Sequence, residues 1–401
     1  MHSSELLQAC RLKPSAFTRE RKLTFPVLLS TMLACMSGSV HAELMSFFAN
    51  LDNRADLIKE VSKQAFSQAR QHFSAQAFTR LNRCLIEQVQ DVLPRWQGLR
   101  LVAADGSALC LPGRQIGSTH KVNALAFALY LPGAELTLSA ELYDPCVGER
   151  QMLFEHLDQL QPDDLLLLDQ GYPCRWLAAV LSQKQRHFCV RVDQCNFTAV
   201  QTLRRSTQNE VTAKLTAPNN RDAKDYECER TPTTVRFIKT ICPNGQIRIV
   251  MTNLLDAERY PAHVFSSLYH QRWRIEEAFK RLKRRLHLES VTGDNWLAAQ
   301  QDFGAKIVAD NLHSLCVMAA TKDLPAEKAD GTCYKINRTT AISILKRCLP
   351  GVLLGKPSAL KRLKLALTEI RKSLINFNPR ARKERTNHPK PHDYIAYKAT
   401  V

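Results

Sequence analysis

The sequence predicts a mixed α/β protein with a central mixed β-sheet and a helical region at each end of the chain. Helical periodicity dominates residues 1–92, and short apolar runs alternate with helical segments over 93–193. Long helical patterns return after residue 260. The chain has 401 residues, 45% of them hydrophobic, so it is long and apolar enough for several globular domains with a sizeable core.

The charge of the chain indicates the class of its partner. A formal net charge of +18 and a pI near 9.5 suit a polyanion, because lysine and arginine neutralise phosphates and release counterions. We therefore expect a polyanion, such as double-stranded DNA, as the partner class. Charge alone predicts no chemistry.

The cysteines exclude two classes of small domain. There are 13 of them, an odd number, and no Cys-x-x-Cys pair occurs, so neither a zinc finger nor a disulfide scaffold is expected. Reduced and mostly buried thiols in a cytoplasmic, nucleoid-associated protein are expected instead.

An N-terminal segment is similar to a secretory signal. A basic cluster, Arg19 to Lys22, precedes an apolar run, Phe25 to Met36. However, eighteen residues precede the cluster, and the run contains Pro26 and Ser30. We therefore expect a buried helix, and no membrane association.

Residues 1–92 are predicted to form a helical DNA-binding module. Within it, residues 56–61 and 62–70 could form a helix-turn-helix, with Ser62 as the N-cap of the second helix. An ordinary helical hairpin is the alternative.

From Leu99 the pattern of hydrophobic residues changes from the helical period to one typical of β-strands. The predicted order is β-β-β-α-β-α-β, over residues 99–104, 121–131, 135–142, 148–160, 164–168, 175–184 and 187–192, with a turn at Pro132-Gly133. This order is that of the ribonuclease-H-like fold, a mixed sheet made of three antiparallel strands followed by two crossovers. We assign the core to 93–193 and 261–322.

Two aspartates end strands that are neighbours in that fold. Asp105 follows the first strand and Asp169 follows the fourth. Their adjacency comes from the fold, and not from their spacing in the sequence. Active sites gather at strand ends in open α/β sheets. The acids Asp163 and Asp164 precede the fourth strand and are expected to be cap and turn residues at its other end.

Two regions flank this core in the sequence. Residues 194–260 are predicted to form an inserted β subdomain, with strands over 198–202, 233–239 and 247–252. A helical C-terminal region, 323–401, follows a long helix at 296–321 and contains helices at 336–347 and 359–374. Its basic tail, from Arg371, is either a DNA-tracking arm or a solubilising terminus.

The segment 269–283 places polar residues in one stripe. Tyr269, Arg272 and Lys283 lie at offsets −7, −4 and +7 from Glu276, which fall on one face of a helix with about 3.6 residues per turn. A carboxylate among cations fits a site where a metal ligand meets a phosphate. A surface helix with an Arg272–Glu276 pair is the alternative.

Three carboxylates, Asp105, Asp169 and Glu276, are therefore the candidate catalytic residues and metal ligands. Phosphoryl transfer on DNA uses two divalent ions about 4 Å apart. Hard oxygen ligands on a sheet and an adjacent helix suit Mg²⁺. We expect Tyr269, Arg272 and Lys283 to bind the DNA phosphates. The neighbouring Glu277 should lie about 100° around the helix from the metal face.

These residues together resemble the bacterial insertion-sequence transposases of the DDE class. The group is marked by a Tyr-(2)-Arg-(3)-Glu-(6)-Lys signature, the insertion-sequence-four family, and Tyr269, Arg272, Glu276 and Lys283 match every spacing. Asp105-Gly-Ser and Asp169-Gln-Gly-Tyr match the first two motifs. Gln170 departs from the arginine that is more frequent in that family.

The resemblance implies a transposase that binds the terminal inverted repeats of its element, cleaves the ends and joins them to target DNA. It also implies two Mg²⁺ ions, for which Mn²⁺ can substitute, and a homodimer in the synaptic complex. Two alternatives remain open. One is a metal-dependent nuclease on the same fold, and the other is a DNA-binding protein with an inert site.

Overall fold

The computed structural model describes residues 1–19, 21–111, 123–241, 245–322, 324 and 333–377. The chain forms two compact units. Unit 1 comprises residues 1–85, 108–124 and 280–401, and unit 2 comprises residues 86–107 and 125–279. The predicted basic tail lies outside the described residues, apart from its first few positions.

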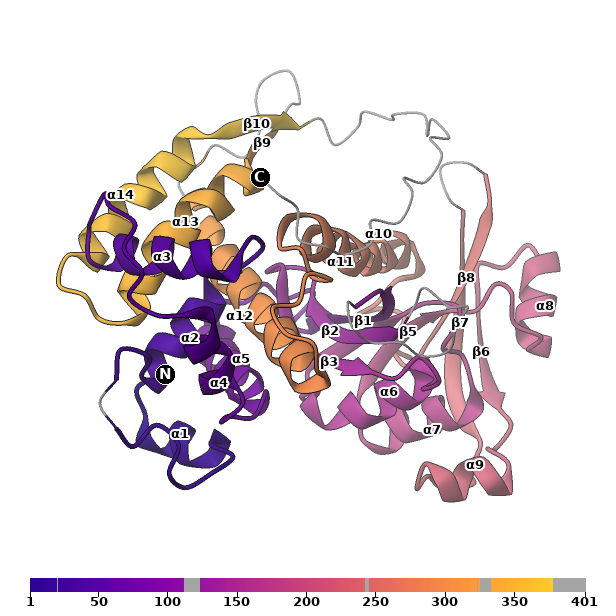
Figure 1. Cartoon of the computed structure of the whole chain (residues 1–401). Helices are drawn as coiled ribbons and strands as arrows, with labels where there is room; N and C mark the ends of the chain where they lie inside the picture. Colours follow the sequence, from indigo (N-terminus) through magenta and orange to yellow (C-terminus); the bar gives the residue numbers. More distant parts are fainter. Residues whose placement is uncertain (20, 112–122, 242–244, 323, 325–332, 378–401) are drawn as a thin grey trace. The chain divides into compact units, whose positions relative to one another are not determined.

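Unit 2 is built on an eight-stranded sheet with the order β3-β2-β1-β4-β5-β8-β7-β6 (Figure 1). β1 is parallel to β4, and β4 is parallel to β5. The first five strands have the ribonuclease-H-like order that the sequence predicted. The bounds are β1 Arg100–Leu109, β2 Ala124–Leu131, β3 Leu136–Tyr143, β4 Asp164–Leu168, β5 His187–Arg191, β6 Glu210–Leu215, β7 Thr233–Ile241 and β8 Ile247–Thr252.

Helices cover both faces of this sheet. α6 (Glu149–His156) and α7 (Arg175–Gln183) lie on one face, and α10 (Phe265–His270) lies on the other (Figure 1). Every residue of β4 is buried, as expected for a central parallel strand with covered faces. The turn at Pro132-Gly133 and the helices predicted after β3 and β4 are confirmed.

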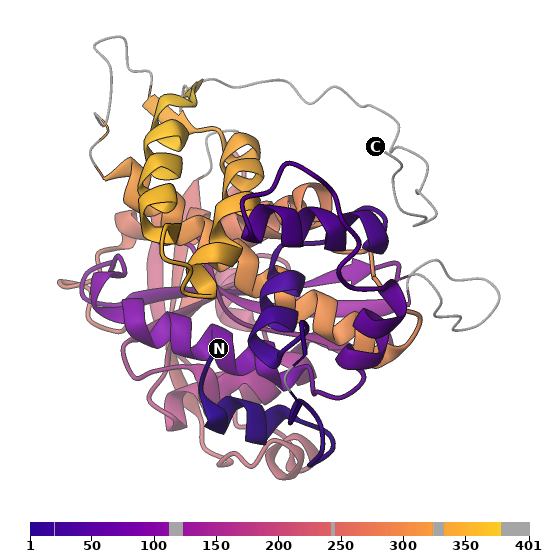
Figure 2. The same cartoon turned by 60° about the vertical axis from the view of Figure 1, so that its left-hand side comes forward.

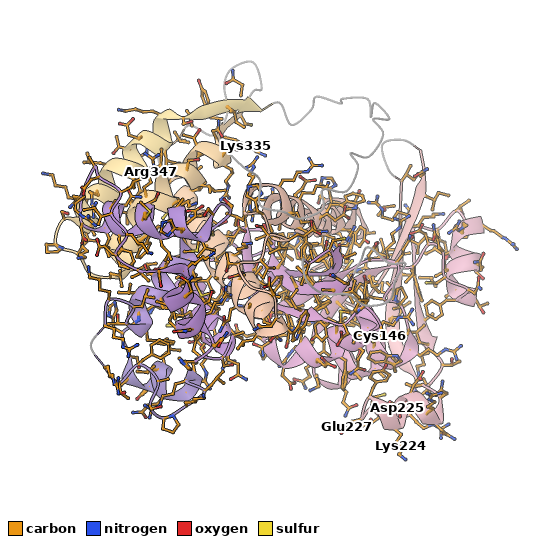
Figure 3. The ribbon with its side chains drawn as sticks, in the orientation of Figure 1. Cys146, Lys224, Asp225, Glu227, Lys335 and Arg347 are labelled. Atoms are coloured by element: carbon orange, nitrogen blue, oxygen red, sulfur yellow. The ribbon has the colours of Figure 1, made fainter. Side chains whose placement is uncertain are left out.

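The residues between β5 and α10 extend the same sheet. β8 pairs antiparallel with β5, β7 pairs with β8, and β6 pairs with β7. The predicted strand at 198–202 is wrong, because α8 (Thr198–Arg205) forms there. Val200 and Leu203, three residues apart, are both buried, so one helical face packs inward and overrides the β-branched composition. A short helix, α9 (Asn220–Asp225), precedes β7, with Lys224 and Asp225 at the surface (Figure 3).

A buried ion pair fixes the register of β1 against β4. Arg100 lies opposite Asp164, and its guanidinium donates from Nε and Nη2 to the two carboxylate oxygens at 2.6 and 2.7 Å. Both side chains are almost completely buried. Asp164 was expected to be a cap or turn residue, and it does accept a bond from the Gln161 N–H. Its main partner, Arg100, was not expected.

Unit 1 is helical. Its N-terminal helices pack against its C-terminal ones, since α2 contacts α12 and α13, and α3 contacts α13 (Figure 2). The bounds are α1 Ser4–Cys10, α2 Phe25–Leu33, α3 Val40–Leu51, α4 Lys63–Arg70, α5 Gln76–Val89 (which continues into unit 2), α12 Trp296–Thr321, α13 Arg338–Leu353 and α14 Ala359–Lys372. A two-stranded sheet of β9 (Cys333–Ile336) and β10 (Leu374–Phe377) was not predicted.

Two N-terminal predictions have different outcomes. α2 is the expected buried helix, and no helix in the described ranges is long and apolar enough to cross a membrane. The helix predicted at 56–61 does not form, so a helix-turn-helix with that first helix is wrong. Glu60 instead pairs with Lys22 and Arg54, which ties this irregular segment to its neighbours in front of α4, where Ser62 is the N-cap as predicted.

The long helix α12 buries polar side chains, and each of those described below has a partner within unit 1. Asp302 and Gln301 bind the buried Arg70, and Asp310 binds Arg281 in a bidentate pair at 2.6 and 2.8 Å. Lys306 donates to two backbone carbonyls. Such satisfied networks are retained in cores because an unpaired buried charge is costly.

The cysteines of the described residues are all free thiols, as predicted. Burial raises the pKa of Cys35 to about 12, so this thiol is inert. Cys146, before α6, is exposed (Figure 3).

Breaking the Arg100–Asp164 pair should destabilise the protein strongly. Asp164→Asn leaves the Arg100 charge buried and unpaired, so we expect a loss of about 3–5 kcal/mol in the free energy of unfolding. Urea denaturation followed by tryptophan fluorescence measures it.

The adjacent Arg95–Asp163 pair provides a matched control. Its side chains are 42% and 38% exposed, so Asp163→Asn should cost less than about 1 kcal/mol. Equal losses from the two substitutions would contradict a special role for the buried pair.

Candidate active site

The strand register places the first two predicted acids side by side. The pairing of β1 with β4 ends at Ala103 and Leu167, and Asp105 and Asp169 each lie two residues further on. Asp105 does not end its strand as predicted, because β1 continues to Leu109. Its Oδ1 accepts a hydrogen bond from the Gly106 N–H at 2.9 Å.

The helical segment that carries the signature is divided into three pieces. α10 ends at His270, a 3₁₀ turn covers Gln271–Trp273, and α11 runs over Arg274–Arg285. One continuous helix was predicted. The side chains of Tyr269, Arg272 and Glu276 still gather at the two aspartates, as their contacts show.

Tyr269 links the helical segment to the end of β4. Its hydroxyl lies 3.2 Å from the Leu168 carbonyl oxygen and 3.3 Å from Asp169 Oδ1, either of which can accept its proton. The ring is buried, and the Arg248 guanidinium lies 5.3 Å from its centroid. Such a cation–π contact holds the ring in place.

Arg272 is the centre of the site. Its Nη2 donates to Glu276 Oε1 at 2.6 Å, its Nη1 lies 3.5 Å from Asp105 Oδ2, and its Nε lies 4.0 Å from Asp169 Oδ1. All three predicted carboxylates therefore surround one guanidinium. The arginine side chain is 3% exposed, whereas the acids are 20% (Asp105), 35% (Asp169) and 41% (Glu276) exposed. The acids thus face solvent, and the cation lies beneath them.

The electrostatics of the site favour the protonated form of Asp105. Burial, with smaller contributions from the carboxylates of Glu149 and Glu276, raises the pKa of Asp105 to about 7. Arg272 and the Gly106 N–H act in the opposite direction. A carboxyl group in such surroundings is stabilised by binding either a proton or a cation.

Glu149, on the first turn of α6, was not predicted to belong to the site. A Cβ atom added to Gly106 would lie 2.7 Å from Glu149 Oε1, so this carboxylate lies directly against the residue that follows Asp105. The pattern offered one signal, an acid that opens the helix after the third strand. That position is also common in ordinary helices, where an acid stabilises the helix dipole.

The remaining predicted residues lie as follows. Lys283 belongs to unit 1, where its Nζ donates to the Ala108 carbonyl oxygen at 2.6 Å. Glu277 is exposed on α11. His156, outside the site, is buried and bonded to Ser139, and burial lowers its pKa to about 4.

The carboxylate oxygens of Asp105, Asp169 and Glu276 are chemically suited to bind a divalent metal ion. Among the described residues, no three acidic, histidine or cysteine side chains are already grouped to ligate one ion. The contacts above explain this, because the Arg272 guanidinium lies among the three acids. Carboxylate oxygens are the ligands that Mg²⁺ prefers. Two nitrogen atoms of the buried guanidinium, Nε and Nη1, have no hydrogen-bond partner among the residues that the structure describes, so its polar surroundings there are incomplete.

Comparison with known proteins places the chain among transposases. Residues 96–312 match the family described as "Transposase DDE domain". The transposase InsG for insertion sequence element IS4 from Escherichia coli (strain K12) is 24% identical over 311 residues, which cover 72% of this chain and 68% of that protein. The piggyBac transposase synaptic complex with hairpin DNA aligns with 88% of this chain and 79% of its own, at 10% identity and a TM-score of 0.44. That likeness is remote, and the fold assignment depends on the strand order instead.

The raised pKa of Asp105 predicts a pH-dependent stability of the metal-free protein. The carboxyl group binds a proton below about pH 7 in the folded state, but only below the ordinary value of 3.8 in the unfolded state. The folded state therefore binds more protons in this window, and stability falls as pH rises from about 4 to about 7. Urea unfolding in EDTA at several pH values measures it.

Asp105→Asn should remove the contribution of the Asp105 proton to stability, so that the free energy of unfolding of the metal-free protein depends less on pH. Asp158→Asn, on an exposed side chain outside the site, is the control that should keep the wild-type dependence. An unchanged dependence in Asp105→Asn would show that the buried carboxyl group is not its source.

Proposed function

Because the chain belongs to the transposase DDE family, and is thus an enzyme of DNA transposition, we propose that it acts on the ends of its own element. It binds the terminal inverted repeats, cleaves the ends and joins them to target DNA by two-metal phosphoryl transfer. One observation carries the proposal: Asp105, Asp169 and Glu276, distant in the sequence, all lie within 4.0 Å of the Arg272 guanidinium. The family match supports DNA as the substrate.

We assign the metal ligands to the three carboxylates. The family implies the use of a divalent metal, and Asp105, Asp169 and Glu276 are proposed to hold two Mg²⁺ ions, for which Mn²⁺ can substitute. Two such ions activate the attacking oxygen and stabilise the leaving oxygen. The exposed sides of the carboxylates are open to a DNA backbone, whereas Arg272 is covered.

Arg272 is proposed to serve both an acid and the DNA. Nη2 already holds Glu276 in place through a bond of 2.6 Å. Nε and Nη1 are buried and face Asp169 and Asp105, so the proposed contribution of Arg272 to a DNA phosphate is the attraction of its charge and not a direct contact. Tyr269 orients Asp169, and Lys283 adds a phosphate contact further along α11.

The helical regions are proposed to bind the repeats. The net charge of +18 suits contacts to phosphates along a duplex. Exposed cations such as Arg347 on α13 and Lys335 on β9 lie on the surface of unit 1 (Figure 3). Pairing of two ends by one protein each implies a homodimer in the synaptic complex.

The three acids are tested by their isosteric amides. Asp105→Asn, Asp169→Asn and Glu276→Gln should each lower end cleavage and joining at least a hundredfold, because each removes a metal ligand. Binding of repeat-ended DNA should remain within about threefold. Gel assays of cleavage and joining with Mg²⁺, beside fluorescence anisotropy for binding, measure the two properties.

Glu277→Gln is the matched control, since Glu277 is the next residue on the same helix and points into solvent. It should cleave and join like the wild type. Full activity of Glu276→Gln would overturn the site assignment, and cleavage without any joining by the wild type would favour a nuclease.

Tyr269→Phe tests the orientation of Asp169. The substitution keeps the ring and removes the hydroxyl that lies 3.3 Å from Asp169 Oδ1. A hydrogen bond to a charged group contributes about 1.5–3 kcal/mol, so joining should slow by roughly tenfold or more. Single-turnover assays at saturating DNA measure the rate, and an unchanged rate would show that the hydroxyl has no positioning role.

A further inference from the structure

Two glycines border the aspartates of the site, and one carboxylate lies against both. Gly106 follows Asp105, and Gly171 lies two residues after Asp169. A Cβ atom on Gly106 would come within 2.7 Å of Glu149 Oε1, and one on Gly171 would lie 4.0 Å from Glu149 Oε2. The Glu149 carboxylate therefore lies between the two chain segments that carry the aspartates.

The position of Glu149 is held by the residues around it. Arg150, the next residue, donates from Nε to the Gly171 carbonyl oxygen at 3.0 Å and from Nη2 to that of Pro173 at 3.3 Å. These bonds tie the start of α6 to the loop that follows Asp169. Met152 and Leu153 are completely buried and fix the helix against unit 2.

A buried hydroxyl lies against the Glu149 carboxylate. Tyr172 is 1% exposed. Burial raises the pKa of its hydroxyl, as do the charges of Glu149, Asp105 and Asp169 and a polar contact with Glu149. The Nε and Nη1 atoms of Arg272, which face Asp169 and Asp105 without a hydrogen-bond partner among the described residues, point to a ligand that completes the site.

The charges indicate what that ligand is. The carboxylates of Asp105, Asp169 and Glu276 lie within 4.0 Å of the Arg272 guanidinium, and Glu149 lies close enough to Asp105 to raise its pKa. Counted together, these four carboxylates and one guanidinium carry a net charge of −3. Two divalent cations and one phosphodiester of the substrate would bring the total to zero. Without Glu149, the same two cations and phosphodiester would leave a net charge of +1.

We propose that Glu149 is a fourth carboxylate of the active site and a ligand to one of the two divalent ions, beside Asp105 and Asp169. The proposal rests on the function proposed above. A favourable interaction of Glu149 with the N-terminus of α6 is the ordinary explanation for an acid at this position. This explanation does not account for the position of the Glu149 carboxylate against Gly106, the residue next to the proposed metal ligand Asp105.

Metal binding without DNA tests the proposal. We expect two Mn²⁺ ions per wild-type chain in a titration followed by the EPR signal of free Mn²⁺. Glu149→Gln should lower the affinity for one of the two Mn²⁺ ions by tenfold or more and leave the affinity for the other nearly unchanged. The concentration of Mg²⁺ for half-maximal joining should rise by a similar factor, while the rate at saturating Mg²⁺ falls less.

A second variant perturbs the same carboxylate from the opposite side. Gly106→Ala inserts a methyl group 2.7 Å from Glu149 Oε1, so the Glu149 side chain must move. The substitution should therefore lower the affinity for one Mn²⁺ ion, as Glu149→Gln does. Gly148→Ala is the matched control, because nothing lies within 4 Å of its added methyl group. Circular dichroism and the melting temperature in EDTA show that each variant is folded.

Two outcomes separate the proposals. If Glu149→Gln binds both ions as the wild type does, Glu149 is not a ligand, and the proposal fails. If Asp105→Asn also binds both ions unchanged, the proposed function itself is wrong. Loss of one ion in Glu149→Gln, with wild-type binding in Asp158→Asn and Gly148→Ala, supports the fourth ligand.

Discussion

The site depends on one buried cation, the guanidinium of Arg272, which three carboxylates share. Three like charges brought together at the edge of a sheet repel each other, and their burial adds to the cost, as the raised pKa of Asp105 shows. Arg272 offsets this cost in the metal-free protein, with Glu276 bonded at 2.6 Å and the two aspartates within 4.0 Å. The same cation limits how closely the acids approach each other. We infer that metal ions, together with the substrate phosphate, balance the negative charge of the carboxylates that one arginine cannot neutralise.

The fold prepares this arrangement far from the acids themselves. The Arg100–Asp164 pair, at the start of β1 and β4, fixes a parallel register in which Asp105 and Asp169, the two aspartates proposed to bind metal, lie at the same height. A shift of this register by one residue would turn one of them to the opposite face of the sheet. On the helical side, the 3₁₀ turn at Gln271–Trp273 joins α10 to α11, and Tyr269 bonds to the end of β4. The residues that fix the register thus differ from the proposed metal ligands, which are Asp105 in β1 and Asp169 directly after β4.

The sequence predicted the elements whose patterns are strong. The apolar run of β4, the long α12 and the strands at 233–239 and 247–252 were found because their periods and lengths are distinct. The sequence-based prediction was wrong where tertiary contacts decide which element forms. Residues 56–61 are irregular and not helical, and Glu60 there forms ion pairs. The buried face of α8 outweighs the β-branched residues that favoured a strand, and β1 continues beyond Asp105. The acids were found from their motifs, but the central place of Arg272 and the closeness of Glu149 depend on side-chain directions that spacing does not encode.

The convergence of Asp105, Asp169 and Glu276 on shared metal ions is tested most directly by anomalous diffraction from Mn²⁺ in crystals of the protein bound to an inverted-repeat end. We expect Mn²⁺ peaks within about 2.5 Å of carboxylate oxygens from all three residues, with Arg272 still beneath them. Peaks elsewhere on the chain, or a Glu276 side chain turned away from the two aspartates, would contradict it.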